Sequence, residues 1–367
     1  MVKMAGGTPA TGSAGWCPTN RNMGFLSRTF FSLMYIVSSY TIAVIFCVVT
    51  MLCWGSWANT SKCTNEKWPF TLFYWDYSFG LILAALIYGF TMGSTGTSGR
   101  SFLDDIRQAD LNSILFASLG GAIFNLSNLL VIAAIAIAGF SVAYPVTGGL
   151  ALVLGVILVY IKVPTGNPVL LFLGVGLIVT AIIVNAIASA RTSAKKGDTS
   201  KKGIIIAILS GVIMSFFYRF VSDGMSTEFI TPAPGKLTPY SAILVFSVGL
   251  FISNFIWNSF FMYRPLTGRP VSYMQYIKNG TFMQHAIGIL GGIIFNTGFL
   301  FSLIASDKAG PAISYGLGQG ATMIGAAWGI FVYKEFKGAS VTVIMLLVIM
   351  FITFIIGLAF IILARLN

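Results

Sequence analysis

Long uncharged stretches, separated by short clusters of charged and polar residues, dominate the pattern along the chain. Because a helix needs about 20 consecutive apolar residues to cross a bilayer, each stretch predicts a membrane span. The pattern indicates ten spans, near residues 34–57, 72–92, 113–137, 140–161, 168–190, 204–222, 239–262, 281–304, 309–333 and 339–364. The predicted fold class is therefore an all-α membrane protein with ten transmembrane helices.

The composition favours the same class. The chain is 56% hydrophobic and only 9% charged, as expected of a protein with many spans in a bilayer. Its net charge of +12 is scattered among short loops, which favours contact with lipid headgroups and argues against a nucleic-acid groove. Since Lys and Arg gather on the cytoplasmic side, the densest basic cluster predicts a cytoplasmic connector in a multi-pass protein of the plasma membrane; it contains Arg191, Lys195, Lys196, Lys201 and Lys202.

Residues 120–149 and residues 291–320 are two copies of one helix-turn-helix pattern, and they align without a gap. The first copy begins GGAIFN and the second GGIIFN. This duplication makes predicted spans 3 and 4 equivalent to spans 8 and 9, so each half holds five spans. After an odd number of crossings the second half enters from the opposite face, which predicts two inverted five-helix repeats, an architecture of secondary transporters.

The duplication also sets the expected domain organisation. Residues 34–190 form the first five-helix repeat and residues 204–367 the second, joined by the basic connector 191–203. Residues 1–33 lack helical periodicity and predict a disordered N-terminal extension, whose presence in the mature protein is left open. Residues 100–112 carry apolar side chains at helical spacing, which predicts a short surface helix.

Asp76 is a rare charged residue within a predicted span. A carboxylate near hydrocarbon is unfavourable unless it is paired, hydrated or protonated, so Asp76 is the candidate for coupling protons to transport. The alternative is that Asp76 caps the second span at the water interface, inside an aromatic belt. The chain's one histidine, His285, is expected at the interface of the eighth span.

Uncharged amides in the spans suit a neutral polar solute better than an ion; the candidates are Asn125, Asn128, Asn296 and Gln319. The alternative is that they hydrogen-bond between helices, which contributes on the order of 1 kcal/mol per bond.

Two spans are interrupted at matching positions, by Tyr-Pro-Val-Thr at 144–147 and by Tyr-Gly-Leu-Gly-Gln at 315–319. Matching interruptions in the two halves point to a central binding site, with close packing of small residues as the alternative. Trp54, near the end of span 1, is expected either to stack on a planar ligand or to anchor the span at the interface. The predicted substrate-binding residues are Trp54, Asn125, Asn128, Tyr144, Thr147, Asn296, Tyr315 and Gln319.

Enzymatic function finds no support in the motifs. With one histidine, neither a His-Glu-x-x-His metal site nor a Ser/His/Asp arrangement is apparent, and the connector lacks a phosphate-binding loop pattern. The four cysteines show no metal-ligand spacing. We therefore expect no enzyme, no cofactor and no metal, and the absence of a carboxylate from span 1 argues against efflux of lipophilic cations.

Several motifs, in this order, resemble one known family. They are Trp54, Asp76-Tyr77, Gly120-Gly121 with Asn128, YRPxxGxPxS at 263–272 and WGxxxYKE at 328–335. From about Tyr35 to Asn367, the chain resembles the ureide permease family within the drug/metabolite transporter superfamily. The resemblance implies two inverted five-helix repeats and proton-coupled uptake of allantoin-like ureides, uracil, xanthine or related oxo-heterocycles.

The connector departs from the pattern of the family's plant members, which carry a longer connector with a nucleotide-binding-like motif. With its short connector, the chain is more similar to a microbial branch of the family, whose substrates could differ. The expected partners are a small-molecule solute, protons and the lipid bilayer, with formation of a homodimer left open. Two other functions also stay open, namely sugar transport and a scaffold or sensor that retains the fold without transporting.

Overall fold

The computed structural model describes residues 33–64, 68–192, 201–266 and 268–366. In these ranges the regular structure is helical, with isolated β-bridges in the loops. Of the predicted extension 1–33 only Leu33 is described, and it forms a bridge with Gly96. Most of the predicted connector 191–203 also lies outside the described residues.

Within the described ranges, nine helical segments are long and apolar enough to cross a membrane, which confirms the all-α membrane class. They contain α2 (Tyr40–Ser56), α4 (Phe70–Phe90), α6 (Leu111–Ala138), α7 (Phe140–Lys162), α8 (Pro168–Thr192), α9 (Lys201–Gly224), α10 (Pro239–Asn254), α13 (Phe282–Ala309) and α16 (Val341–Leu366). Short helices lie between them, namely α3 (Asn59–Lys62), α5 (Phe102–Gln108), α11 (Trp257–Tyr263) and α12 (Tyr273–Asn279). α5 confirms the predicted surface helix.

The predicted ninth span, residues 309–333, is divided into three pieces. They are α14 (Pro311–Gly318), α15 (Ala321–Ala327) and the single-turn π-helix η1 (Trp328–Val332). The break falls at Gln319 and Gly320, where glycine weakens the helix because its backbone loses more freedom on folding than other residues lose. None of the three pieces alone reaches spanning length, so the tenth span and the inverted arrangement stay predictions.

The duplicated sequence makes duplicated contacts. A Cβ atom on Gly121 of α6 would lie 2.1 Å from the carbonyl oxygen of Phe246 in α10, and one on Gly292 of α13 would lie 2.0 Å from the carbonyl oxygen of Tyr77 in α4. Glycine is therefore required at both crossings, because any side chain would overlap the facing backbone. α6 packs on α10 as α13 packs on α4, which positions the helices that surround the centre of the bundle.

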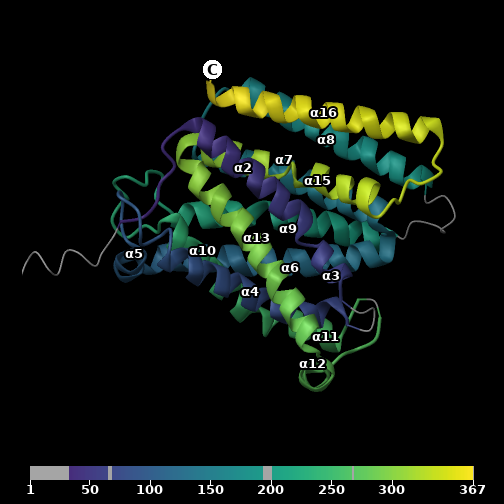
Figure 1. The fold of residues 1–367 in the computed structure, drawn as a ribbon, viewed down its shortest axis with the longest axis horizontal. Coiled ribbons are helices and arrows are strands. Elements are labelled where there is room, and N and C mark those ends of the chain that lie inside the picture. Colours follow the sequence, from purple (N-terminus) through teal and green to yellow (C-terminus); the bar gives the residue numbers. More distant parts are fainter. Residues whose placement is uncertain (1–32, 65–67, 193–200, 267, 367) are drawn as a thin grey trace, which may run out of the picture.

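The short helices α5 and α12 mark opposite ends of the bundle (Figure 1). α5 follows the C-terminal end of α4, whereas α12 is hydrogen-bonded to residue Asp76 near the N-terminal end of α4. Ser101 caps α5, and Ser272 with Gln275 forms a capping box on α12, so each sequence specifies where its helix begins. α8 and α16 lie side by side along one edge of the bundle (Figure 1).

Candidate solute-binding cavity

A cavity of about 130 Å³ lies among α2, α6, α7, α9, α13 and the α14–α15 break. Its volume suits a solute smaller than a drug-sized ligand. Two of its walls come from the last turn of α2 and the first turns of α7, so the cavity lies in the half of the bundle nearer the α12 end. The lining residues are Trp54, Trp57, Phe124, Asn128, Val131, Tyr144, Thr147, Gly148, Ala151, Met214, Phe217, Phe295, Gln319, Ala321 and Thr322.

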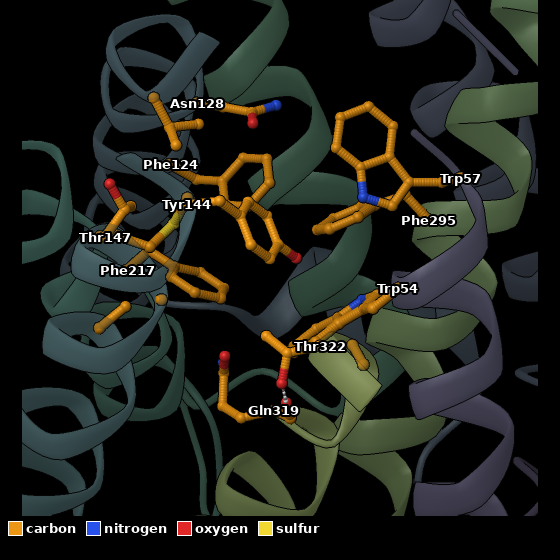
Figure 2. A pocket seen from close by; sticks show the side chains of 15 residues that line it. Trp54, Trp57, Phe124, Asn128, Tyr144, Thr147, Phe217, Phe295, Gln319 and Thr322 are labelled. Atoms are coloured by element: carbon orange, nitrogen blue, oxygen red, sulfur yellow. Dashed lines mark hydrogen bonds between the residues drawn. The ribbon is translucent and has the colours of Figure 1, made fainter. Parts of the chain in front are cut away.

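Aromatic rings line the cavity on two facing sides (Figure 2). The Trp54 ring is stacked on Phe295 with centroids 5.7 Å apart, and the Trp57 ring meets Phe295 edge-on at 5.9 Å. The ring centroid of Phe124 lies 4.8 Å from that of Phe295 and 5.2 Å from that of Phe217. Such walls offer flat apolar faces on which a planar solute can stack.

Five of the eight predicted substrate-binding residues line this cavity together, namely Trp54, Asn128, Tyr144, Thr147 and Gln319. The indole nitrogen of Trp54 is buried and has no hydrogen-bond partner among the described residues, which leaves a donor for a solute oxygen. Asn128 donates its amide to the Tyr74 hydroxyl at 3.2 Å, so its carbonyl oxygen is available as an acceptor.

Two threonine hydroxyls of the cavity wall are bonded to the protein itself. Thr147 donates to the carbonyl of Ala207 at 3.0 Å, which fixes α7 against α9. Thr322 donates to the carbonyl of Gln319 at 3.0 Å, the bond drawn in Figure 2, and this bond stabilises the break between α14 and α15.

The other three predicted residues lie outside the cavity lining and bond neighbouring helices. Asn125 donates to the Leu250 carbonyl at 3.2 Å, and Asn296 donates to the Leu81 carbonyl at 2.7 Å. Tyr315 donates to the carbonyl of Ala151 at 3.1 Å, behind the cavity wall. Their placement fits the alternative of hydrogen bonding between helices.

Asp76 is buried in the second turn of α4, whereas the N-cap position is occupied by Pro69. The alternative that Asp76 caps the span is therefore wrong, because its carboxylate does not reach the free N–H groups of the first turn. Instead Oδ1 accepts from the Tyr276 hydroxyl at 2.5 Å and from His285 Nδ1 at 2.8 Å. Burial raises the pKa of the Tyr276 phenol well above its usual value, and the bond to Asp76 adds to this, so Tyr276 stays a donor at neutral pH.

Asp76 does not line the cavity, but its neighbours on α4 touch residues that do. Tyr74 accepts the hydrogen bond from Asn128, and the Tyr77 ring packs against the Trp57 ring with centroids 4.8 Å apart. A shift of the first turns of α4 would therefore move two walls of the cavity.

Sequence reasoning missed most of the aromatic wall. Phe124 and Phe295 occupy the same position in the two copies of the repeat, so the GGxIFN pattern contained a signal for them. Phe217 and Thr322 carry no comparable signal, since an isolated Phe or Thr in a span is ordinary.

A search of family models matches the ureide permease family at residues 73–202 and 190–364. Ureide permease 1 of Arabidopsis thaliana is 26% identical over 385 residues, covering 89% of this chain and 97% of that protein. Ureide permease 2 of the same plant is 24% identical over 390 residues, covering 88% and 96%. Probable ureide permease A3 of Vigna unguiculata is 24% identical over 336 residues, covering 73% and 88%.

A crystal structure, described only as that of a protein, superposes with a TM-score of 0.55 at 16% identity, covering 89% of this chain and 98% of that one, which supports the fold alone. Fold and relatives together define a multi-pass integral membrane transporter for a small-molecule solute, and not an enzyme. The chain belongs to the ureide permease family, which confirms the resemblance seen in its motifs.

Proposed function

We propose that this chain takes up a small neutral ureide such as allantoin, or an oxo-heterocycle such as uracil or xanthine, across the plasma membrane. The observation that carries the proposal is the pairing, in one cavity, of a Trp54 donor that has no partner in the described part of the chain with the Asn128 carbonyl acceptor, beside stacked aromatic rings. Uracil and xanthine are flat, allantoin has a nearly flat ring with a ureido group on a tetrahedral carbon, and all of them present amide-type N–H and C=O groups that complement both features.

We further propose that transport proceeds by alternating access between the halves 34–190 and 204–367, acting as two inverted five-helix repeats. The matched crossings at Gly121 and Gly292 support equivalent halves. The cavity lies between elements of both halves, where relative rotation would expose it first to one side and then to the other.

Uptake is proposed to be coupled to protons through Asp76. A buried carboxylate with one oxygen lacking a partner among the described residues can accept a proton, and its neighbours Tyr74 and Tyr77 touch cavity residues. Uptake into proteoliposomes, with and without an inward proton gradient, tests both the transport of the solute and its coupling to protons. Accumulation should require the gradient, and Asp76→Asn should lower accumulation to the level without a gradient; unchanged accumulation by that variant would show that the coupling role is wrong.

Trp54→Phe tests the solute site, since it removes the donor and keeps a ring. Losing one hydrogen bond of about 1–2 kcal/mol should raise the apparent KM for the ureide roughly tenfold. Trp257→Phe makes the same chemical change on α11, outside the cavity lining, and should leave KM unchanged. A panel of competing ureides, nucleobases and sugars identifies the solute. Competition by sugars alone would show that the chain transports a sugar and not a ureide.

The membrane orientation follows from the connector, which is proposed to face the cytoplasm with the α12 end. Cys63 is exposed just after α3, at the same end. In a Cys17→Ser background, an impermeant thiol reagent applied to intact cells should leave Cys63 unlabelled. Labelling of Cys63 would show that the α12 end faces the outside of the cell instead.

A further inference from the structure

α12 lies on the surface of the bundle and contributes no buried residue of its own. Two of its tyrosines hydrogen-bond into the bundle: Tyr276 donates to Asp76 on α4 at 2.5 Å, and the Tyr273 hydroxyl bonds the Ser259 hydroxyl of α11. Ring contacts with Trp68 and His285, at 5.9 Å and 4.9 Å between centroids, surround Tyr276. A helix this short has little stability alone, so its position depends on these contacts, and the Tyr276 bond is the one that ends on a carboxylate.

The Asp76 carboxylate is bonded unevenly. Both donors, the Tyr276 hydroxyl and His285 Nδ1, converge on Oδ1, whereas Oδ2 is buried and has no partner among the described residues. A charged oxygen without a partner is unfavourable in a buried site. A proton bound at Oδ2 removes that penalty, and it also weakens the two bonds at Oδ1 because they are no longer assisted by charge.

We propose that the Asp76, Tyr276 and His285 side chains form a proton-controlled latch, which holds α12 against α4 when Asp76 is ionised and releases α12 when Asp76 binds a proton. Tyr276 and His285 are positioning residues for that proton. The proposal rests on the proton coupling proposed above and adds the element that moves. Among the described residues, the titratable groups that contact the carboxylate from packed elements are Tyr276 from α12 and His285 from α13.

The latch communicates with the cavity through α4. Asp76 lies between Tyr74, which bonds Asn128, and Tyr77, which packs on Trp57. Release of α12 frees the first turns of α4 at the same end of the bundle where these cavity residues lie. Proton binding and access to the cavity are thereby linked.

Hydrogen–deuterium exchange of the wild-type chain in lipid nanodiscs, without solute, tests the latch. Protection of residues 273–279, corrected for the intrinsic effect of pH, should fall about tenfold as the pH is lowered through the titration of Asp76. In Tyr276→Phe, residues 273–279 should show at every pH the low protection that the wild type shows in acid. Tyr263→Phe, the same change at an exposed tyrosine of neighbouring α11, should behave as the wild type.

His285→Gln keeps a hydrogen-bond donor but removes the titratable ring, and it should retain the fall in protection with acid. Loss of the pH dependence in His285→Gln would assign the titration to the histidine and overturn the proposal. Protection in the wild type that does not change with pH, or Tyr276→Phe indistinguishable from the wild type, would also overturn it. Because no solute is present, failure to transport ureides would refute the proposed function and leave this result standing.

Discussion

The α5 end and the α12 end of the bundle carry the same kind of element but hold it in different ways. A short surface helix precedes the long helix of each repeat copy, α5 before α6 and α12 before α13. The register shift that relates Asn125 to Asn296 also relates Asp105 of α5 to Tyr276 of α12. Both side chains bond to the other half of the chain, Asp105 at the start of α10 and Tyr276 near the start of α4.

At the α5 end both oxygens of the buried carboxylate have partners. Arg100 donates to Oδ1 of Asp105 at 2.7 Å, while the backbone N–H and hydroxyl of Thr238 donate to Oδ2 at 2.7 and 3.0 Å. Ser241 donates to the same oxygen, and Gln108 bonds the loop before α10 through both ends of its amide. Donors on both oxygens therefore hold this carboxylate in place.

At the α12 end one oxygen of Asp76 takes both bonds and the other takes none among the described residues. The comparison indicates that the α5 end is tied by a saturated network, whereas the α12 end is tied by bonds that a single proton can weaken. The cavity lies nearer the α12 end, on the same side of the bundle as these weaker bonds.

The largest effect is expected from Asp105→Asn, which breaks the network at the α5 end. Removing one partner of a buried ion pair leaves Arg100, only 19% exposed, without its counter-charge. We expect a loss of about 3 kcal/mol in the free energy of unfolding, measured by denaturant titration of the purified protein in detergent.

Asp104→Asn is the matched control for this variant. Asp104 lies next in the chain but its side chain is 45% exposed, and Arg107 Nη1 lies 3.8 Å from its carboxylate. An exposed pair of this kind contributes at most about 1 kcal/mol, so the control should unfold nearly as the wild type does. Equal losses in the two variants would mean that the network around Asp105 does not stabilise the α5 end.

A second prediction tests whether the two halves are equivalent at their helix crossings. Gly121→Ala and Gly292→Ala each place a methyl group about 2 Å from a facing carbonyl. Overpacking of this kind costs about 1–3 kcal/mol, and the two variants should lose similar amounts in thermal unfolding. Gly176→Ala, on α8 with open space around it, should show no loss. A large loss in one crossing variant and none in the other would break the equivalence.

The crossings also show what could be predicted from the sequence. The duplicated GGxIFN pattern predicted that spans 3 and 8 are equivalent, but not that a glycine of each lies at a helix crossing, which only the structure shows. The pattern could not decide whether Asn125 and Asn296 face a solute or a helix, because the packing of the helices sets their partners. Asn125 donates to a backbone carbonyl and to the Ser253 hydroxyl of α10. Asn296 donates to a backbone carbonyl of α4 and to the Ser247 hydroxyl of α10. Similarly, the bond from His285 to Asp76 depends on how α4 and α13 cross, and local sequence placed that histidine only at an interface.

A third, smaller effect is expected from removing these two amides. Asn125→Ala and Asn296→Ala should each lower stability by about 1 kcal/mol, the usual contribution of one hydrogen bond between membrane helices. Neither variant should change the KM for the solute, since neither residue lines the cavity. Uptake kinetics in proteoliposomes decide the matter, and a several-fold increase in KM in either variant would place that asparagine in the solute site.

The smallest effect concerns the caps at the two ends, where Asp110 on α6 and Thr281 on α13 stand in equivalent register. The Asp110 carboxylate accepts from the Ser113 backbone N–H at 2.6 Å, and this bond lowers the pKa of Asp110 below its usual value. A carboxylate whose folded pKa is lowered stabilises the fold above its unfolded pKa, about 3.9, and that contribution is lost as the pH falls through the folded value. Hydrogen exchange should therefore show acid fraying of the first turn of α6 but not of α13. Asp110→Thr should remove that acid sensitivity, and Thr281→Asp should transfer it to α13; equal fraying of both helices in the wild type would contradict the assignment to the cap.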